Sequence, residues 1–371
     1  MTPQLFERNH QPIRMLSLAP AVLKSLLFVA LFGLVACAKS TDSSAPGAKS
    51  TAAPAKGEAV KLMGSGASFP APIYDRWFKE FSKKDGQITV DYQSVGSGQG
   101  VKSFVAGHTD FGASDAAMTD EEIKEAKDNV LLLPMTAGSV VLAYNLEGVA
   151  ELKLSRAAYS SIFAGKITNW NDPAIAATNP GVTLPDQAIA VVHRSDGSGT
   201  TFVFTQHLAT INEGWKASPG VGKSIEWPTG VGAKGNEGIS AQVRQTPGAI
   251  GYIEFAYAVL SKQPMAALEN KAGKFIAPTL DSAAAALSSV ELPADFRAWI
   301  NDPTGDGAYP IVTYTWILTR KKYDDPAKAD AIKKVLAWSL TEGQKLSAGL
   351  NYIPLPATVV AKVERAVTQI N

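Results

Sequence analysis

Several residue types are scarce in this chain, and each scarcity excludes a class of protein. Its 371 residues include one cysteine, Cys37, which excludes internal disulfides and cysteine-based metal clusters. The four histidines, at positions 10, 108, 193 and 207, form no metal-ligand pattern such as H-E-x-x-H, so no metal or other cofactor is expected. A net charge of +1 lacks the basic excess of a general nucleic-acid binder. Any anion site must therefore be built from local groups rather than from the field of the whole protein.

Long apolar runs are equally scarce. The run "SLLFVALFGLVA" (25–36) is shorter than the ~20 residues needed to cross a bilayer, and no later run is longer. With its preceding basic residues it predicts a signal peptide over 1–37. Its end, "LVAC", resembles a bacterial lipobox, which predicts a lipid anchor on Cys37. A plain signal peptide with an incidental cysteine is the alternative.

The region behind the leader changes composition twice. Residues 38–59 are rich in Ala, Ser, Pro, Lys and Gly without apolar periodicity, which predicts a flexible linker. From residue 60 short apolar runs alternate with amphipathic stretches, which predicts an α/β fold. We expect strands at 60–66, 87–95, 188–194 and 309–321, two buried strands within 129–146, and a strand at the start of 248–260. We expect helices at 70–81, 101–107, 200–211 and 325–340, the last with Pro326 in its first turn and Ile332, Val335 and Leu336 facing inward.

Three of the predicted strands end in a glycine- and serine-rich turn that opens a helix. These turns are "GSGASF" (64–69), "GSGQGV" (96–101) and "DGSGTT" (196–201). In open α/β sheets ligands bind beyond the carboxyl ends of strands, where helix N-termini offer unpaired N–H groups. Three such ends in one place would form an anion site with little formal charge.

The stretch "HRSDGSGTT" carries the strongest of these signals. Arg194 offers a planar fork of donors to an oxyanion, and Asp196 is placed to orient it. Ser198 and Thr200 offer hydroxyl donors, and the N–H groups of Gly199 and Thr200 open the helix. A surface turn with an arginine–aspartate pair is the structural alternative.

The other turns are ambiguous when each is taken alone. "GSGASF" has Phe69 where a dinucleotide-binding fingerprint has its third glycine, and Asp91 lies in mid-strand rather than at a strand end. Ser68 alone fits a helix N-cap, and Ser97 suits a tight turn. Asp115, in "DFGASDA", alone fits a cap or turn residue.

An enzyme is the second class of function to consider. His193, Asp196 and Ser198 are the residue types of a hydrolase triad. Neighbours within one turn seldom form a line from nucleophile to base to orienting acid, and no G-x-S-x-G elbow is present. A phosphatase that uses Ser198, and a surface adhesin or scaffold on the same fold, remain the alternatives to a binding protein.

Longer motifs give a family resemblance. "GSGASFPAPIY", "YQSVGSGQGVKSF", "DFGASDAAMTDEE", "GKITNWND", "VVHRSDGSGTTFVFTQHL" and "GVGAKGNEGISAQVRQTPGAIGYIEFAYA" follow one another in this order. The chain thereby resembles the phosphate-binding, Pst-type substrate-binding proteins of bacterial phosphate ABC transporters. The resemblance implies a type II periplasmic-binding-protein fold, with domain I at 60–137 plus 313–371, domain II at 138–312 and a ligand cleft between them.

The resemblance also implies a ligand set and a role. Its phosphate ligands fall on Ser68, Phe69 (backbone N–H), Ser97, Asp115, Arg194, Ser198, Gly199 and Thr200, with Asp196 as the partner of the arginine. Gly98 stands where a second serine is common in the family, and His193 where a basic residue often stands. The implied role is non-catalytic delivery of phosphate to membrane permease subunits, in the periplasm or cell envelope, with membrane contact only through the lipid anchor.

Asp115 has a distinct expected role within this set. An ionised aspartate only accepts hydrogen bonds. It therefore accepts a bond from the O–H of phosphate, while unprotonated sulfate faces it as a like charge.

Overall fold

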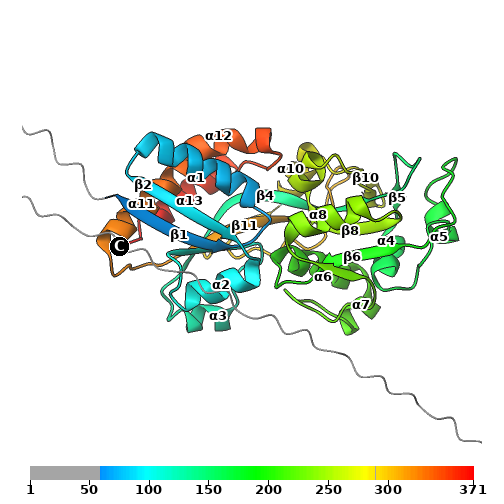
Figure 1. The fold of residues 1–371 in the computed structure, drawn as a ribbon, viewed down its shortest axis with the longest axis horizontal. Coiled ribbons are helices and arrows are strands. Elements are labelled where there is room, and N and C mark those ends of the chain that lie inside the picture. The colour runs from blue at the N-terminus through cyan, green and yellow to red at the C-terminus, as the bar shows by residue number, and fades with distance from the viewer. Residues whose placement is uncertain (1–58, 289) are drawn as a thin grey trace, which may run out of the picture. The chain divides into compact units, whose positions relative to one another are not determined.

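The computed structural model describes residues 59–288 and 290–371 (Figure 1). The predicted signal peptide, Cys37 and the linker up to residue 58 lie outside the described residues. Within them the predicted α/β architecture is present: a mixed eight-stranded sheet carries helices on both faces.

The elements have the following bounds. The main sheet runs, in spatial order, through β2 (Ile88–Ser94), β1 (Val60–Gly66), β3 (Phe111–Ser114), β11 (Val312–Thr319), β4 (Leu131–Tyr144), β8 (Ala249–Glu254), β6 (Ala190–Arg194) and β7 (Val231–Ala233). A second sheet contains β10 (Phe275–Ile276), β9 (Ala267–Glu269) and β5 (Lys153–Leu154). The helices are α1 (Ala71–Asp85), α2 (Ser97–Val105), α3 (Asp120–Glu125), α4 (Arg156–Phe163), α5 (Pro173–Ala176), α6 (Gly199–Ile211), α7 (Glu213–Ala217), α8 (Gly235–Gln245), α9 (Phe255–Leu260), α10 (Leu280–Leu287), α11 (Pro326–Trp338), α12 (Gln344–Ser347) and α13 (Ala357–Val367).

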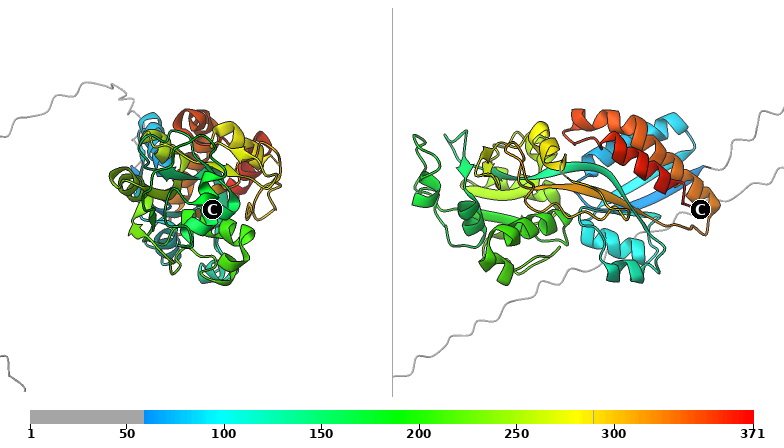
Figure 2. Two further views of the ribbon diagram at one scale, coloured as in Figure 1. Left: turned by 90° about the vertical axis from the view of Figure 1, so that its right-hand side faces the viewer. Right: turned by 180° about the vertical axis from the view of Figure 1, so that it is seen from behind.

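The helices cover both faces of the strands in each half of the main sheet. Figure 1 and the reverse view in Figure 2 show α1, α11 and α13 on one face of β2, β1 and β3, with α2 and α3 on the other. The strands β8 and β6 lie between α8 and α6 in the same way. Because both faces are covered, the central strands read as continuous apolar runs rather than as alternating ones.

One long strand corrects the prediction for residues 129–146. The sequence predicts two strands there, but β4 continues unbroken from Leu131 to Tyr144. Pro134 lacks an N–H donor, and β11 shifts its register between Thr315 and Trp316 beside it, so a bulge absorbs the proline without ending the strand. β4 pairs with β11 up to Ser139 and with β8 from Val140 onward.

The helices follow the predicted apolar stripes closely. Helix α1 buries Ile73, Trp77 and Phe81, and α11 buries its three predicted inward residues. The Asp325 side chain caps α11 by accepting from the N–H of Ala327, with Pro326 at the first helical position. Helix α2 differs from its prediction because it begins at Ser97, within the glycine turn itself. The turn therefore supplies helical N–H groups rather than leading up to them.

None of the helices formed by residues 59–288 and 290–371 combines the length and the apolar character needed to cross a bilayer.

Candidate anion-binding site

The glycine- and serine-rich turns lie against one another, as the sequence predicts. The N–H of Gly98 donates to the carbonyl of Gly197 at 2.7 Å, which joins the second turn to the third. A Cβ atom on Gly199 would lie 2.5 Å from Ser97 Oγ and 2.7 Å from the Cβ of Asp115. Only glycine fits at position 199, because any side chain would separate the start of α6 from Ser97 and Asp115.

Arg194, at the end of β6, provides the buried positive charge of the site. Its side chain is 1% exposed, and it donates from Nε and Nη2 to the two carboxylate oxygens of Asp196 at 2.7 and 2.5 Å. Its Nη1 donates to Thr200 Oγ1 at 3.4 Å, and its backbone N–H donates to the hydroxyl of Tyr252 at 3.0 Å. The expected pairing of Arg194 with Asp196 is therefore present, and it fixes the plane of the guanidinium.

Each partner of this ion pair favours the charged form of the other, which lowers the pKa of Asp196 and raises that of Arg194. Burial alone would raise the pKa of Asp196, but the hydrogen bonds and charge of Arg194 outweigh it and hold that pKa below its usual value. Burial alone would lower the pKa of Arg194, and Asp196 outweighs it to raise that pKa. Asp196 also accepts a hydrogen bond from the N–H of Gly235 at 3.1 Å. Both side chains stay charged at neutral pH.

Asp115 lies directly after β3 in a different environment. The residue is 2% exposed, and its Oδ1 accepts from Thr315 Oγ1 at 2.9 Å. Its backbone N–H donates to Ser97 Oγ at 3.2 Å, and that hydroxyl lies 3.4 Å from Asp115 Oδ2. Burial raises the pKa of Asp115 to about 7, against the lowering effects of Thr315, Arg194 and Ser97. Asp115 is therefore a buried titratable group, and its interpretation as an ordinary cap or turn residue is wrong.

Ser68 lies between β1 and α1 and does not cap the helix. The N-cap position of α1 is Pro70, which forms no side-chain capping bond, so the N-cap interpretation of Ser68 is wrong. Its hydroxyl instead accepts from the backbone N–H of Asn236 at 3.1 Å and from Asn236 Nδ2 at 2.9 Å. The Ser68 carbonyl accepts from the hydroxyl of Tyr257 at 2.7 Å. These bonds tie the first turn to α8 and α9.

Phe69 is fixed by packing on its ring and by a hydrogen bond to its carbonyl. The residue is fully buried, and its carbonyl accepts from the hydroxyl of Tyr352 at 2.6 Å. A Cβ atom on Gly138 would lie 2.9 Å from its ring, so this glycine lets β4 approach. The fixed ring and carbonyl leave the backbone N–H of Phe69 with a defined direction.

The backbone N–H groups of the buried residues Phe69, Gly199 and Thr200 are among those that have no hydrogen-bond acceptor within residues 59–288 and 290–371. Two of them open the 13-residue helix α6, whose N-cap residue Ser198 accepts from the N–H of Thr201 at 3.0 Å. Buried N–H groups are nearly always paired in folded proteins. Together with the helix dipole they fit an anion.

All the predicted ligand residues are thus brought into one region, but three neighbours that support them were missed. Asn236 lies in a fourth glycine-rich helix start, "GAKGNEG", which is the signal that could have found it. Thr315 and Tyr252 lie inside buried strands, and nothing in their local sequence connects them to Asp115 or Arg194. Their contribution depends on strand pairing alone.

The hydrolase triad does not form. The ring of His193 stacks on Trp227 with centroids 4.9 Å apart, and its Nδ1 lies 3.2 Å from the carbonyl of Arg194. Ser198 Oγ caps α6 and Asp196 binds the guanidinium, so no hydrogen bond links the three residues in the described structure. The residues described also contain no cluster of three potential metal ligands.

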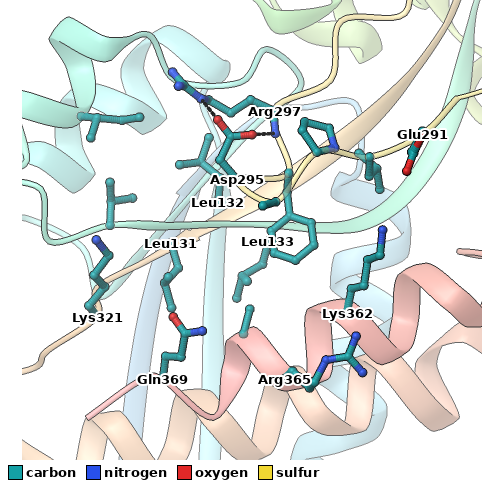
Figure 3. A pocket seen from close by; sticks show the side chains of 17 residues that line it. Leu131, Leu132, Leu133, Glu291, Asp295, Arg297, Lys321, Lys362, Arg365 and Gln369 are labelled. Carbon is teal, nitrogen blue, oxygen red and sulfur yellow. Dashed lines mark hydrogen bonds and ion pairs between the residues drawn. The ribbon is translucent and has the colours of Figure 1, made fainter.

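A cavity of about 970 Å³ lies away from this region, and none of the predicted ligand residues lines it. Figure 3 shows its apolar wall from Leu131 to Leu133, with Lys362 and Arg365 projecting from α13. Arg297 is tied there to Asp295, at 2.8 Å. This cavity lacks the unpaired N–H donors found at the start of α6, so the candidate anion site is the polar region around Arg194 and Asp115.

Comparisons with known proteins agree on the fold and the family. A model of the "PBP superfamily domain" matches residues 42–342. "Phosphate-binding protein PstS" of Xylella fastidiosa (strain 9a5c) is 39% identical over 341 residues, which cover 89% of this chain and 93% of the relative.

Two solved structures show the same fold at 20% identity. The periplasmic phosphate-binding protein PfluDING, bound with phosphate, matches with a TM-score of 0.69 over 82% of this chain and 93% of its own. A putative phosphate ABC transporter substrate-binding protein with bound phosphate from Clostridium perfringens matches with a TM-score of 0.60 over 80% of this chain and 100% of its own. The predicted periplasmic-binding-protein fold is confirmed.

Proposed function

This chain belongs to the family of the PstS phosphate-binding proteins, within the PBP superfamily, and from that premise we propose that it binds inorganic phosphate and delivers it to an ABC-type importer. The family consists of non-catalytic solute-binding proteins, and the absence of a connected triad around Ser198 agrees with that role. The observation that carries the proposal is the buried Arg194 beside the unpaired N–H groups of Phe69, Gly199 and Thr200, with the titratable acceptor Asp115 in the same region.

The proposed ligands divide into donors and one acceptor. Hydroxyls and backbone N–H groups donate to the phosphate oxygens, and Arg194 supplies the full positive charge. The donors are Ser68, Phe69, Arg194, Ser198, Gly199 and Thr200, and Asp196 holds Arg194 in place. Ser97 completes the proposed ligand set; its hydroxyl donates to Asp115 Oδ2 at 3.4 Å, and it must turn from that bond to donate to the phosphate. Because Asp196 already balances the charge of Arg194, much of the anion is held by dipoles rather than by excess charge.

Asp115 selects for a protonated oxyanion under this proposal. Ionised Asp115 accepts a hydrogen bond from a phosphate O–H, and sulfate has none to offer at neutral pH. A buried acceptor left without a donor costs about 1–3 kcal/mol, and two facing negative charges cost more. The pKa of about 7 places the change in this selectivity within the physiological range.

The chain divides, in this proposal, into domain I (60–137 plus 313–371) and domain II (138–312), with the ligand enclosed between them. The chain passes between the proposed domains twice. The first crossing is supported by β4, which pairs with β11 up to Ser139 and with β8 from Val140 onward, and the second by the start of β11 at Val312. Closure is supported by the bond from Gly98 to Gly197, because it joins the two proposed domains.

The proposed setting is the periplasm or cell envelope. The partners are the membrane permease subunits of a phosphate importer, and the anchor is a lipid on Cys37, outside the described residues. Mass spectrometry of the protein from membranes, compared with a Cys37→Ser variant, tests the anchor. A cleaved chain without a lipid in the wild type would contradict it.

Calorimetric titration with phosphate, arsenate and sulfate tests the ligand and the role of Asp115. We expect one tight phosphate site in the wild type and much weaker binding of sulfate, whose affinity is measured by its competition with phosphate. Asp115→Asn should narrow the ratio of phosphate to sulfate affinity by about 10- to 100-fold, because an amide donates to sulfate. The exposed Asp91→Asn is the matched control. Unchanged selectivity in Asp115→Asn would remove this role, and turnover of a phosphate ester that is lost in Ser198→Ala would overturn the binding function.

A further inference from the structure

Asn236 is fully buried in the first turn of α8, beside the proposed phosphate ligands but not among them. Its backbone N–H and its Nδ2 both donate to Ser68 Oγ, at 3.1 and 2.9 Å. Nδ2 also lies 3.4 Å from Thr200 Oγ1. One side chain therefore contacts two hydroxyls that come from opposite sides of the site.

The orientation of the Asn236 amide is fixed by a bond on its other end. Its Oδ1 accepts from the backbone N–H of Glu254 at 2.9 Å. That bond identifies the oxygen of the amide, so the nitrogen is the atom that faces Ser68 and Thr200. A flipped amide would bring its NH2 group against the N–H of Glu254 and lose that bond.

A hydroxyl has one hydrogen to donate and two lone pairs to accept with. At Ser68 both lone pairs are taken by Asn236, and no other donor to this oxygen is present among the described residues. At Thr200 the oxygen accepts from Arg194 Nη1 and from Asn236 Nδ2, both at 3.4 Å. With two donors on each oxygen, the hydrogen of each hydroxyl points in the remaining direction around that oxygen and is free to donate.

We infer that Asn236 is a positioning residue that holds the hydroxyls of Ser68 and Thr200 as donors toward the bound anion. This rests on the proposed function, and it adds a reason for the selectivity. A free hydroxyl turns to accept from a ligand O–H or to donate to a bare oxygen, and so it does not discriminate. With both hydroxyls held as donors, Asp115 is left to accept the ligand's proton.

The inference is tested by a double-mutant cycle between Asn236 and Ser68, with phosphate affinity measured by calorimetry. Asn236→Ala and Ser68→Ala should each weaken binding by about 10- to 100-fold, Ser68→Ala because it removes a donor to a charged group and Asn236→Ala because it frees two donor hydroxyls from their fixed orientation. The double variant should lose less affinity than the product of the two single losses, because part of the effect of Asn236 passes through the Ser68 hydroxyl and the rest through Thr200. A loss equal to the product of the two single losses would overturn the inference.

Two controls separate this outcome from a structural defect and from failure of the proposed function. Asn179→Ala removes a buried amide that bonds to backbone carbonyls away from the site, and it should lower the melting temperature without changing phosphate affinity. If Asn236→Ala does not fold, Asn236→Ser replaces it in the cycle, because the shorter side chain does not reach Ser68. A wild type that binds no phosphate would overturn the proposed function and this inference with it, whereas normal wild-type binding with multiplicative losses would overturn the inference alone.

Discussion

Two aspartates, Asp115 and Asp196, lie on either side of the candidate site, and their environments push their pKa values apart. Asp196 forms a two-pronged ion pair with Arg194, which lowers its pKa. Asp115 is bonded to the hydroxyls of Thr315 and Ser97, and burial raises its pKa to about 7. In the proposed site the first is a counter-charge for Arg194, and the second is the group whose proton state would respond to the ligand. The same residue type thus has two roles because only one of the pair touches a cation.

The largest effect should come from removing Arg194, the cation that is paired with Asp196 and not with Asp115. Arg194→Ala leaves the half-buried Asp196 without its partner and takes away the buried positive charge of the site. Truncation of a buried, hydrogen-bonded charge pair costs about 2–5 kcal/mol. Phosphate affinity, measured by calorimetry, should fall by roughly three orders of magnitude. Arg76→Ala, at an exposed arginine paired with Glu80, is the control; equal affinity in both variants would contradict the role of Arg194.

Asp115→Asn should stabilise the phosphate-free protein at high pH. The pKa of Asp115 in the folded state is raised from 3.8 to about 7, so the folded state holds this proton more tightly than the unfolded state. The stabilising contribution of this bound proton to folding is complete below about pH 4 and is lost as the pH rises through about 7. At pH 8 the burial of a charged carboxylate costs up to roughly 4 kcal/mol, which asparagine avoids. Melting curves of Asp115→Asn should show a higher melting temperature than the wild type at pH 8 but not at pH 4. An equal increase at both pH values would rule out ionisation of Asp115 as its cause.

Asp196→Asn should have the opposite sign. The pKa of Asp196 is lowered in the folded state, so its stabilising contribution is present above its unfolded pKa and is lost as the pH falls through the folded value. Loss of the charge leaves Arg194 buried with a weaker partner, at a cost of about 1–3 kcal/mol. Denaturant unfolding at pH 7 should show this loss, and it should shrink at strongly acid pH. Stabilisation at pH 7 would show that the two aspartates do not differ in this way.

The smallest effect is expected from an ion pair at the edge of the same site. Lys223 Nζ lies 2.5 Å from Glu122 Oε1, and the Lys223 carbonyl accepts from the N–H of Ser198. Because both side chains are partly exposed, the pair contributes about 1 kcal/mol or less and is screened by salt. Lys223→Ala should weaken phosphate binding severalfold at low ionic strength and less at high ionic strength. Lys345→Ala, at an exposed pair with Glu342, is the control, and a salt-independent loss would contradict an electrostatic cause.

The sequence was most informative where a pattern is local. The apolar stripe of α1 and the Asp–Pro start of α11 predicted those helices within a few residues. It was least informative along β4, where two strands were predicted and one continuous strand carries a bulge beside Pro134. A proline's missing N–H is a local fact, but whether it ends a strand depends on the partner's register.

The sequence by itself determined the chemical groups of the site: three glycine–serine turns, Arg194 and two aspartates. Turn chemistry and helix starts depend on neighbouring residues, and so they are visible in a single sequence. Only the tertiary structure decided what each group faces. Pairing of β11 with β3 and β4 brings Thr315 to Asp115, and α8 brings Asn236 to Ser68. Burial and those distant partners set the protonation of Asp115 and the direction of the Ser68 hydroxyl, because both properties depend on surroundings that sequence neighbours do not supply.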